Sequence, residues 1–444
     1  MRAASRRSEV RLSIERFLLE ESLFLVSCNV TFNSFAASFA RNRRLRQNAM
    51  MSSKTQIVVA APATAQSTIF YLLCTGFVIN GIVISFIGPL IPVFMAKWNL
   101  DYGRAGRFLL VQFATSFVGV LISSALASAK GFKAPITIGL ALLGIGFALL
   151  NAPSYGLALL ACGIYGLGYG FATPGTNLWV SETYGERRSS ALNVANLAWG
   201  VGAIASAPLA KWTIQTATVT RFLYVAASVS FALALVLFQM RFGKPHEEQQ
   251  TPSAPPQRLA GTAVTIGLGT LFYVYVGTEV GTSSWAATHA QRAAVWLGNN
   301  WTLTPMFFFA GLLGGRGAAA AILLRLKETA VAVGGILLAA AGEVLFITAH
   351  SPVALFAGAF FSGLGLSSLY PIYVAWLTKW FSSRARKIGG AMFGLAALGS
   401  ASMPWMVGEV SRAAQSLRTG LLIPLAGCAV MLMVVALLRP GSRS

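Results

Sequence analysis

The sequence has very little charge, and this scarcity sets its class. Only 11% of its 444 residues are Asp, Glu, Lys or Arg, against about 25% in an ordinary soluble domain. With 55% hydrophobic residues, such a chain cannot cover a water-facing surface, which excludes a soluble globular protein. A helix needs about 20 mostly apolar residues to cross a bilayer, so this length leaves room for about twelve spans.

Histidine, cysteine and aspartate are also scarce: three His, four Cys and a single Asp, Asp101. The cysteines lie far apart, without a CxxC pair or the Cys/His spacing of a metal site. No His stands in an HExxH or similar setting. An intramembrane enzyme would need such groups clustered, so this class stays a remote alternative, and we expect no catalytic residues, no metal and no cofactor.

Acidic residues are so few that the formal net charge is +21. In a soluble protein this excess would indicate a nucleic-acid partner, because clustered Lys and Arg neutralise phosphates. Here the basic residues lie mostly between apolar runs, as expected for residues that anchor helix ends. We therefore expect a lipid bilayer, and no nucleic acid, as the partner of this chain.

Twelve apolar segments of spanning length follow one another, with short polar breaks between them. The longest break, 241–260, is rich in Pro, Gln and charge and is typical of a solvated linker. We predict an all-α membrane protein with twelve transmembrane helices in two six-helix halves, 66–240 and 261–444. The expected spans are 69–95, 106–128, 132–151, 154–179, 189–210, 218–240, 261–288, 300–324, 328–349, 352–378, 387–409 and 416–438.

Residues 1–65 form an N-terminal extension that we expect to be disordered or not native. For 1–49 three interpretations compete: a targeting peptide, an interfacial anchor, or a translated upstream region with the true start at Met50 or Met51. The four Glu residues in this stretch argue against a transit peptide. We favour the upstream region, because no pattern there could form a core.

Lys and Arg are distributed unequally over the connections. If the N-terminus is cytoplasmic, the inner connections and C-terminal tail carry sixteen of them and the outer connections eight. Positive charge accumulates on the cytoplasmic side. We therefore expect both termini and the 241–260 linker to be cytoplasmic, in the inner (plasma) membrane of the cell.

The two halves resemble each other in sequence. A shift of 197 residues places identical residues on one another around the fourth and tenth spans. Such a parallel repeat is typical of transporters with their site between two halves. The matched pairs are Gly166 and Gly363, Gly168 and Gly365, Pro174 and Pro371, Trp179 and Trp376, Arg187 and Arg384, and Gly202 and Gly399.

Three motifs carry a family resemblance. The seventh span reads FYVYVGTEVGTSSW over 272–285, the fourth reads GLGYGFATPGTN over 166–177, and Gly314-Gly315-Arg316 follows the eighth. Over about residues 68–438 the chain resembles the major facilitator superfamily, and within it the fucose and glucose/galactose permease branch. The resemblance implies a monomeric secondary active transporter, a symporter or other permease that moves a small polar solute such as a sugar by alternating access.

Two departures from the family pattern concern acidic residues. The superfamily's acidic loop between spans two and three is here 124–133, which has no Asp or Glu. The branch is associated with acidic groups in spans one and four, where this chain offers Asn80 and Asn177. Inherited proton symport is therefore in question, although protons stay a candidate coupling ion.

Two carboxyl groups, Glu279 and Glu343, fall inside predicted spans, where an ionised carboxylate costs at least a few kcal/mol unless it is paired, hydrated or protonated. Glu279 lies near the middle of span seven, between Gly277 and Gly281. It is a candidate for substrate binding and for proton coupling, with a structural acceptor as the alternative. The resemblance places the helix of Glu343 at the periphery, which favours a structural role there.

Amides and aromatic rings complete the predicted site. An amide both donates and accepts, which suits a polyhydroxylated substrate, and sugar rings pack on aromatic planes. The same groups also serve as interhelical hydrogen-bond partners or interface anchors. The predicted substrate-binding residues are Glu279, Asn80, Asn177, Gln112, Trp285, Tyr275, Trp199 and Tyr373.

Arg316 lies at an expected inner helix end and is the candidate conformational switch, with ordinary positive-inside anchoring as its alternative. A drug or metabolite efflux antiporter of the same superfamily remains the main functional alternative. Its usual glycine-rich element in span five is only partly present around Pro208.

Overall fold

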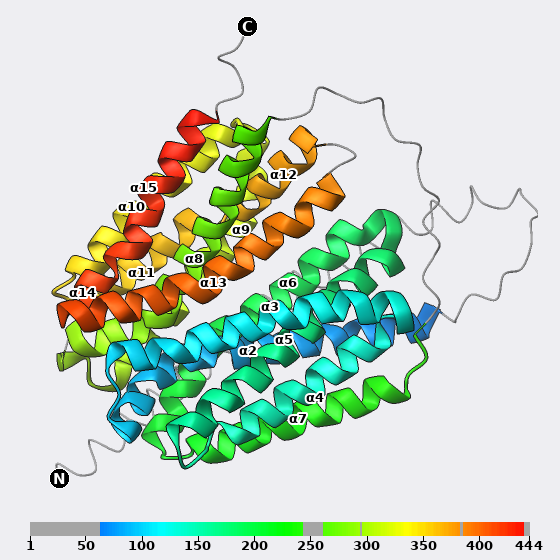
Figure 1. The fold of residues 1–444 in the computed structure, drawn as a ribbon, viewed down its shortest axis with the longest axis horizontal. Coiled ribbons are helices and arrows are strands. Elements are labelled where there is room, and N and C mark those ends of the chain that lie inside the picture. Colours follow the sequence, from blue (N-terminus) through cyan, green and yellow to red (C-terminus); the bar gives the residue numbers. More distant parts are fainter. Residues whose placement is uncertain (1–62, 243–260, 294, 382–384, 439–444) are drawn as a thin grey trace, which may run out of the picture. The chain divides into compact units, whose positions relative to one another are not determined.

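The computed structural model describes residues 63–242, 261–293, 295–381 and 385–438, and all of them belong to one unit, Ala61–Ser444. Every regular element within these ranges is helical (Figure 1). The predicted all-α fold is therefore confirmed. The predicted extension 1–65 and linker 241–260 lie almost wholly outside the described residues, so their assignments stay predictions.

The N-terminal half consists of six helices that match the six predicted spans. Asp101, the single Asp of the chain, precedes the second of them and accepts the backbone N–H of Arg104 at 2.7 Å. This is an N-cap contact, which satisfies one of the free amides at a helix start. The helices are α2 (Ala63–Trp98), α3 (Tyr102–Lys130), α4 (Lys133–Leu149), α5 (Tyr155–Tyr184), α6 (Arg188–Gln215) and α7 (Val219–Gln239), with a 3₁₀ turn at Gly185–Arg187.

The C-terminal half contains the other six spans, two of them interrupted. Pro371 and Pro424 each lie a few residues after a break, where a proline removes one helical hydrogen bond and crowds the preceding carbonyl. The tenth span therefore divides at Ser367 and the twelfth at Leu421. The elements are α8 (Thr262–Ala293), η2 (Val295–Leu303), α9 (Thr304–Leu323), α10 (Glu328–Thr348), α11 (Pro352–Leu366), α12 (Leu369–Phe381), α13 (Ala385–Ala414), α14 (Leu417–Gly420) and α15 (Leu422–Leu437).

Length and apolar composition suit these helices to a bilayer. Among the described residues, ten helical segments are long and apolar enough to cross a membrane, and Lys133–Leu149 is a shorter apolar helix. At 1.5 Å per residue, the 20 residues of α9 span about 30 Å, the thickness of the hydrocarbon core. The ten segments, the shorter helix and α9, which is not one of the ten, together correspond to the twelve predicted spans.

The internal repeat appears as matched helix crossings. A Cβ atom on Gly166 would lie 2.1 Å from the carbonyl oxygen of Gln112, and one on Gly363 would lie 2.0 Å from that of Phe308. Each glycine thus lets its helix, α5 or α11, touch the second helix of its own half. Gly202 makes the same contact with α2 that Gly399 makes with α8. The matched glycines therefore mark crossings where two helix backbones touch and a side chain would not fit.

The two halves meet along three helix pairs, α2 with α8, α3 with α13, and α6 with α9. The α3–α13 contact is tight where α3 begins and α13 ends: a Cβ on Gly106 would lie 3.4 Å from Cα of Trp405. At the same end, Gly88 of α2 meets the backbone of Ser284 on α8. In the predicted topology this is the outer end of the helices.

Candidate functional site

Glu279 lies in the middle of α8, with 15% of its side chain exposed. The flanking glycines face other helices. A Cβ atom on Gly277 would meet the Met403 side chain of α13, and one on Gly281 would lie 4.0 Å from Cβ of Pro424. Their lack of a side chain therefore allows helix packing within the C-terminal half.

Two neighbours of Glu279 compensate its charge. The Tyr275 hydroxyl, one turn earlier on α8, donates to the Glu279 carboxylate at 2.5 Å. The Arg316 guanidinium of α9 lies 4.0 Å from the same carboxylate oxygen and interacts with Tyr275 and Tyr370 of α12. At 4.0 Å the attraction is electrostatic without a direct hydrogen bond. Both charged groups thus keep hydrogen-bonding capacity for another molecule.

The N-terminal half contributes aromatic and hydroxyl groups to the same region. Tyr169 of α5 interacts electrostatically with both Glu279 and Tyr370, and it lies beside Thr173 and Trp199. The Trp199 ring of α6 also packs edge-on against Phe309 of α9, with ring centroids 6.1 Å apart. We define the central cluster as the residues drawn together from both halves: Glu279, Arg316, Tyr275, Tyr370, Tyr169 and Trp199.

Two polar atoms beside this cluster, Nε1 of Trp199 and Oγ1 of Thr173, are buried with only the Tyr169 hydroxyl next to them. Farther along α5, Oδ1 of Asn177 is buried without a hydrogen-bond partner. Buried polar groups are usually satisfied, so each unpaired atom in a native fold calls for an explanation. An indole N–H donates only, a hydroxyl does both, and an amide oxygen accepts. Together with a carboxylate and a guanidinium, these groups can bind a solute that carries many hydroxyls.

The other predicted amides occupy different surroundings. Asn80 of α2 is 1% exposed with an unpartnered Oδ1. Gln112 of α3 accepts a hydrogen bond from the Tyr165 hydroxyl of α5, within the N-terminal half, and its Nε2 is unpartnered. The structure places neither in contact with Glu279, so their binding roles stay predictions.

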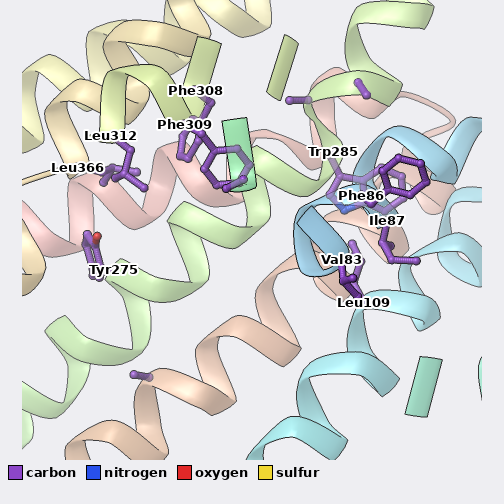
Figure 2. Close-up of a cluster of buried hydrophobic side chains, with 14 of the residues drawn as sticks. Val83, Phe86, Ile87, Leu109, Tyr275, Trp285, Phe308, Phe309, Leu312 and Leu366 are labelled. Atoms are coloured by element: carbon purple, nitrogen blue, oxygen red, sulfur yellow. The ribbon is translucent and has the colours of Figure 1, made fainter. Parts of the chain in front are cut away.

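The two remaining predicted aromatics lie on different sides of the site. The Trp285 indole donates to the Pro404 carbonyl oxygen at 2.8 Å and meets Tyr102 edge-on. Figure 2 shows it among Phe86 and Ile87, far along α8 from Tyr275. Tyr373 of α12 packs edge-on against the Tyr275 ring at 6.0 Å, and its hydroxyl is unpartnered. Tyr373 thus borders the central cluster, whereas Trp285 belongs to the α3–α8–α13 contact.

The predicted substrate-binding residues do not include Tyr169, Tyr370 or Thr173. Tyr169 and Tyr370 are aromatic residues of helices that we expect to line the cavity, in the fourth and tenth spans beside the repeat motifs, and this position is the signal that could have found them. Thr173 carries no such signal, because hydroxyl residues are frequent in these spans.

Comparison with known proteins agrees with this architecture. The sequence profile of the Major Facilitator Superfamily matches residues 73–329, more than half of the chain. No curated protein sequence matches significantly.

Among solved structures, the chain is similar to the Escherichia coli fucose:proton symporter FucP, at 20% identity and a TM-score of 0.57, covering 84% of this chain and 99% of that one. It is also similar to a bacterial homologue of the human lysosomal transporter Spinster in an inward-facing conformation (14%, TM-score 0.68, covering 85% and 96%). A third is the nucleoside transporter NupG (14%, TM-score 0.67, covering 83% and 99%). These likenesses establish a shared fold, and with the profile match they show that the chain belongs to the Major Facilitator Superfamily.

Proposed function

We propose that this protein is a secondary active transporter that moves a small polar solute, such as a sugar, by alternating access between its two halves. The observation that carries the proposal is the central cluster, where a paired carboxylate and guanidinium from one half face aromatic side chains from the other. Within the hydrocarbon region, such polar groups are expensive and mark solute pathways.

The proposed conformation is closed on the outer side. The tight contact of Gly106 with Trp405 lies at the end that the charge distribution assigns to the outside. Arg316 then acts as the switch, because its 4.0 Å pairing with Glu279 can change when solute competes for the carboxylate. We place the protein in the inner (plasma) membrane, with both termini cytoplasmic, as a monomer.

A transport assay with a panel of probes tests this function. Purified protein in lipid vesicles is given labelled L-fucose, D-glucose and uridine, the last because of the nucleoside transporter among its structural neighbours. We expect saturable uptake and counterflow of at least one probe. Transport of a lipophilic cation, with none of the polar solutes, would instead support the efflux antiporter.

Glu279→Gln then assigns the role of the carboxylate. If Glu279 binds solute hydroxyls, the variant loses about 1.5 to 3 kcal/mol of binding, or roughly 10- to 150-fold in affinity. If it carries the proton, exchange stays intact while pH-driven accumulation disappears. Wild-type affinity together with wild-type accumulation would leave Glu279 as an interhelical contact only.

Disulfide trapping tests alternating access independently. The double variant Gly106→Cys/Trp405→Cys places two thiols on facing stretches of α3 and α13, where a Cβ atom on residue 106 lies 3.4 Å from Cα of residue 405. Oxidation should stop transport and reduction should restore it. The pair Gly106→Cys/Gly390→Cys is the control, because a Cβ on Gly390 meets nothing within 4 Å.

A further inference from the structure

Glu343 of α10 is a second carboxyl group within the helices, and it is fully buried inside the C-terminal half. One of its oxygens, Oε1, accepts hydrogen bonds from the Thr282 hydroxyl of α8 and from the Ser362 hydroxyl of α11, the latter at 2.7 Å. The other oxygen, Oε2, is buried without any partner. The two oxygens of one carboxyl group therefore have very different surroundings.

Glu343 lacks a compensating positive charge within the part of the chain that the structure describes. No Lys, Arg or His side chain there forms an ion pair with it, whereas Glu279 has Arg316 beside it. An uncompensated carboxylate away from water is so costly that a buried acid instead takes up a proton or pairs with a cation. The hydroxyl donors on Oε1 offset only part of this cost.

The same position in the N-terminal half has no carboxyl group. A shift of 196 residues places Phe147 on Glu343 and Phe86 on Thr282, and a shift of 197 places Tyr165 on Ser362. These three aromatic residues are fully buried and pack edge-on, Phe86 with Phe147 at 6.1 Å and Phe147 with Tyr165 at 6.2 Å. The fold therefore does not need a carboxyl group there, and the carboxyl group of the C-terminal half calls for another reason.

We propose that Glu343 is a proton-binding site within the C-terminal half, distinct from the central cluster, and that its protonation is coupled to transport. In the acid form, Oε2 carries the proton and Oε1 is the carbonyl oxygen that accepts from Thr282 and Ser362. When the helices around it admit water, the acid transfers this proton to a water molecule. The two hydroxyls then stabilise the carboxylate that remains.

The elements packed around Glu343 present few other titratable groups. Cys428 of α15 interacts with it electrostatically, and Tyr373 of α12 interacts with Cys428. On α8, His289 binds the Phe346 carbonyl oxygen of α10 at 3.0 Å and interacts with Arg418 of α14, while α11 contributes only the Ser362 hydroxyl. None of these groups supplies a paired positive charge to the carboxyl group.

Packing connects this site to the central cluster. Helix α10, which carries Glu343, contacts α12, and Tyr373 of α12 packs against the Tyr275 ring and interacts electrostatically with Cys428. Tyr275 in turn donates to Glu279. A change at Glu343 that moves α12 would therefore alter the contacts of the proposed solute-binding carboxylate. This coupling step rests on the proposed function, whereas proton binding by Glu343 does not.

Infrared spectroscopy tests proton binding without any solute. Purified protein in lipid vesicles is titrated above about pH 6, where exposed carboxyl groups are already ionised. We expect a carbonyl band of a protonated carboxyl group that shifts in D₂O and disappears at high pH. Glu343→Gln should abolish this band, and Glu279→Gln, the matched control, should retain it.

Ser362→Ala provides a second test of the proposal in case Glu343→Gln does not fold. It removes one donor to the carboxylate with little change of volume, so the band should persist to a pH higher by about one unit. A wild-type spectrum without the band, or a band that survives in Glu343→Gln, overturns the proposal. Loss of the band on adding Na⁺ at constant pH and ionic strength would also overturn it, because the site would then bind a metal cation.

Coupling is measured on whichever probe solute the wild-type protein transports. Glu343→Gln should retain counterflow and lose accumulation driven by a pH gradient, whereas undiminished accumulation contradicts coupling. If no probe is transported by the wild-type protein, the proposed function fails, while the infrared result still decides whether Glu343 binds a proton.

Discussion

The two halves of this protein share their backbone contacts and differ in where they carry charge. Gly168 of α5 packs onto α4 at Leu143, and its counterpart Gly365 of α11 packs onto α10 at Ala339. A Cβ atom on either glycine would lie no more than 2.5 Å from the backbone nitrogen of the residue it faces. Such pairs recur at the equivalent crossings of both halves. The repeat thus preserves the positions where helices must approach closely.

The charged residues within the helices are not repeated between the two halves. A shift of 196 residues places Val83 on Glu279 and Val120 on Arg316, so the ion pair of one half corresponds to two valines in the other. Glu343 likewise corresponds to Phe147. Both halves therefore share the helical framework, whereas the Glu279–Arg316 pair and Glu343 have no charged counterpart in the N-terminal half, so the fold of a half does not require them.

We expect the largest loss of stability when a glycine that both halves share is replaced by a larger residue. Gly166→Val and Gly363→Val each force a side chain into a carbonyl oxygen about 2 Å away, so we expect both variants to lose at least about 3 kcal/mol or to fail to fold. Thermal unfolding in detergent measures the loss. Gly156→Ala, where a Cβ meets nothing within 4 Å, should match the wild type. If one of the two valine variants folds normally and the other does not, Gly166 and Gly363 are not equivalent positions.

Exchanging the carboxyl group between equivalent positions tests whether the C-terminal half is adapted to hold it. Phe147→Glu buries a carboxyl group among aromatic rings that can donate no hydrogen bond to it, apart from the engaged Tyr165 hydroxyl, and should cost about 3 to 5 kcal/mol. Glu343→Gln keeps an oxygen that accepts from Thr282 and Ser362, so its cost should stay below about 1 kcal/mol. Melting temperatures of the two variants check this. Equal losses would mean that the C-terminal pocket of hydroxyls gives a carboxyl group no advantage.

Removing one member of the ion pair should have a smaller effect. Arg316→Met leaves the Glu279 carboxylate with Tyr275 alone, and we expect a loss of about 1 to 3 kcal/mol, because both groups are partly exposed. The double variant Arg316→Met/Glu279→Gln should recover most of it. Arg412→Met, which breaks the more exposed pair with Glu409, serves as the control and should change little. Additive losses in the double variant would show that the two groups do not interact.

Much of the fold could be predicted from the sequence because apolar length and basic residues report directly on a bilayer. The span limits agree with the helix limits to within about six residues, the largest difference being the start of α2 at Ala63. The breaks at Ser367 and Leu421 were missed, since a proline such as Pro174 also occurs inside the continuous helix α5. Local sequence does not say which proline breaks its helix.

The site could be predicted only in part. Glu279 is conspicuous because a carboxyl group in mid-span is rare, but its pairing with Arg316 depends on how α8 and α9 pack. Trp285 shared the same span and motif, yet its indole binds the Pro404 carbonyl oxygen. The hydroxyl partners of Glu343 could not be found either, because Ser and Thr are frequent in every span.

The smallest expected effect distinguishes two buried tyrosines, one in each half. The Tyr165 hydroxyl donates to Gln112, so Tyr165→Phe leaves that amide oxygen unsatisfied and should cost about 1 kcal/mol. The Tyr373 hydroxyl is buried without a partner, so Tyr373→Phe removes an unpaired group and should leave stability unchanged or raise it by up to about 1 kcal/mol. Thermal unfolding without solute gives both values. A clear loss in Tyr373→Phe would mean that this hydroxyl is hydrogen-bonded to water in the resting protein. In that case the water would lie between the central cluster and Glu343, where a proton relay would need it.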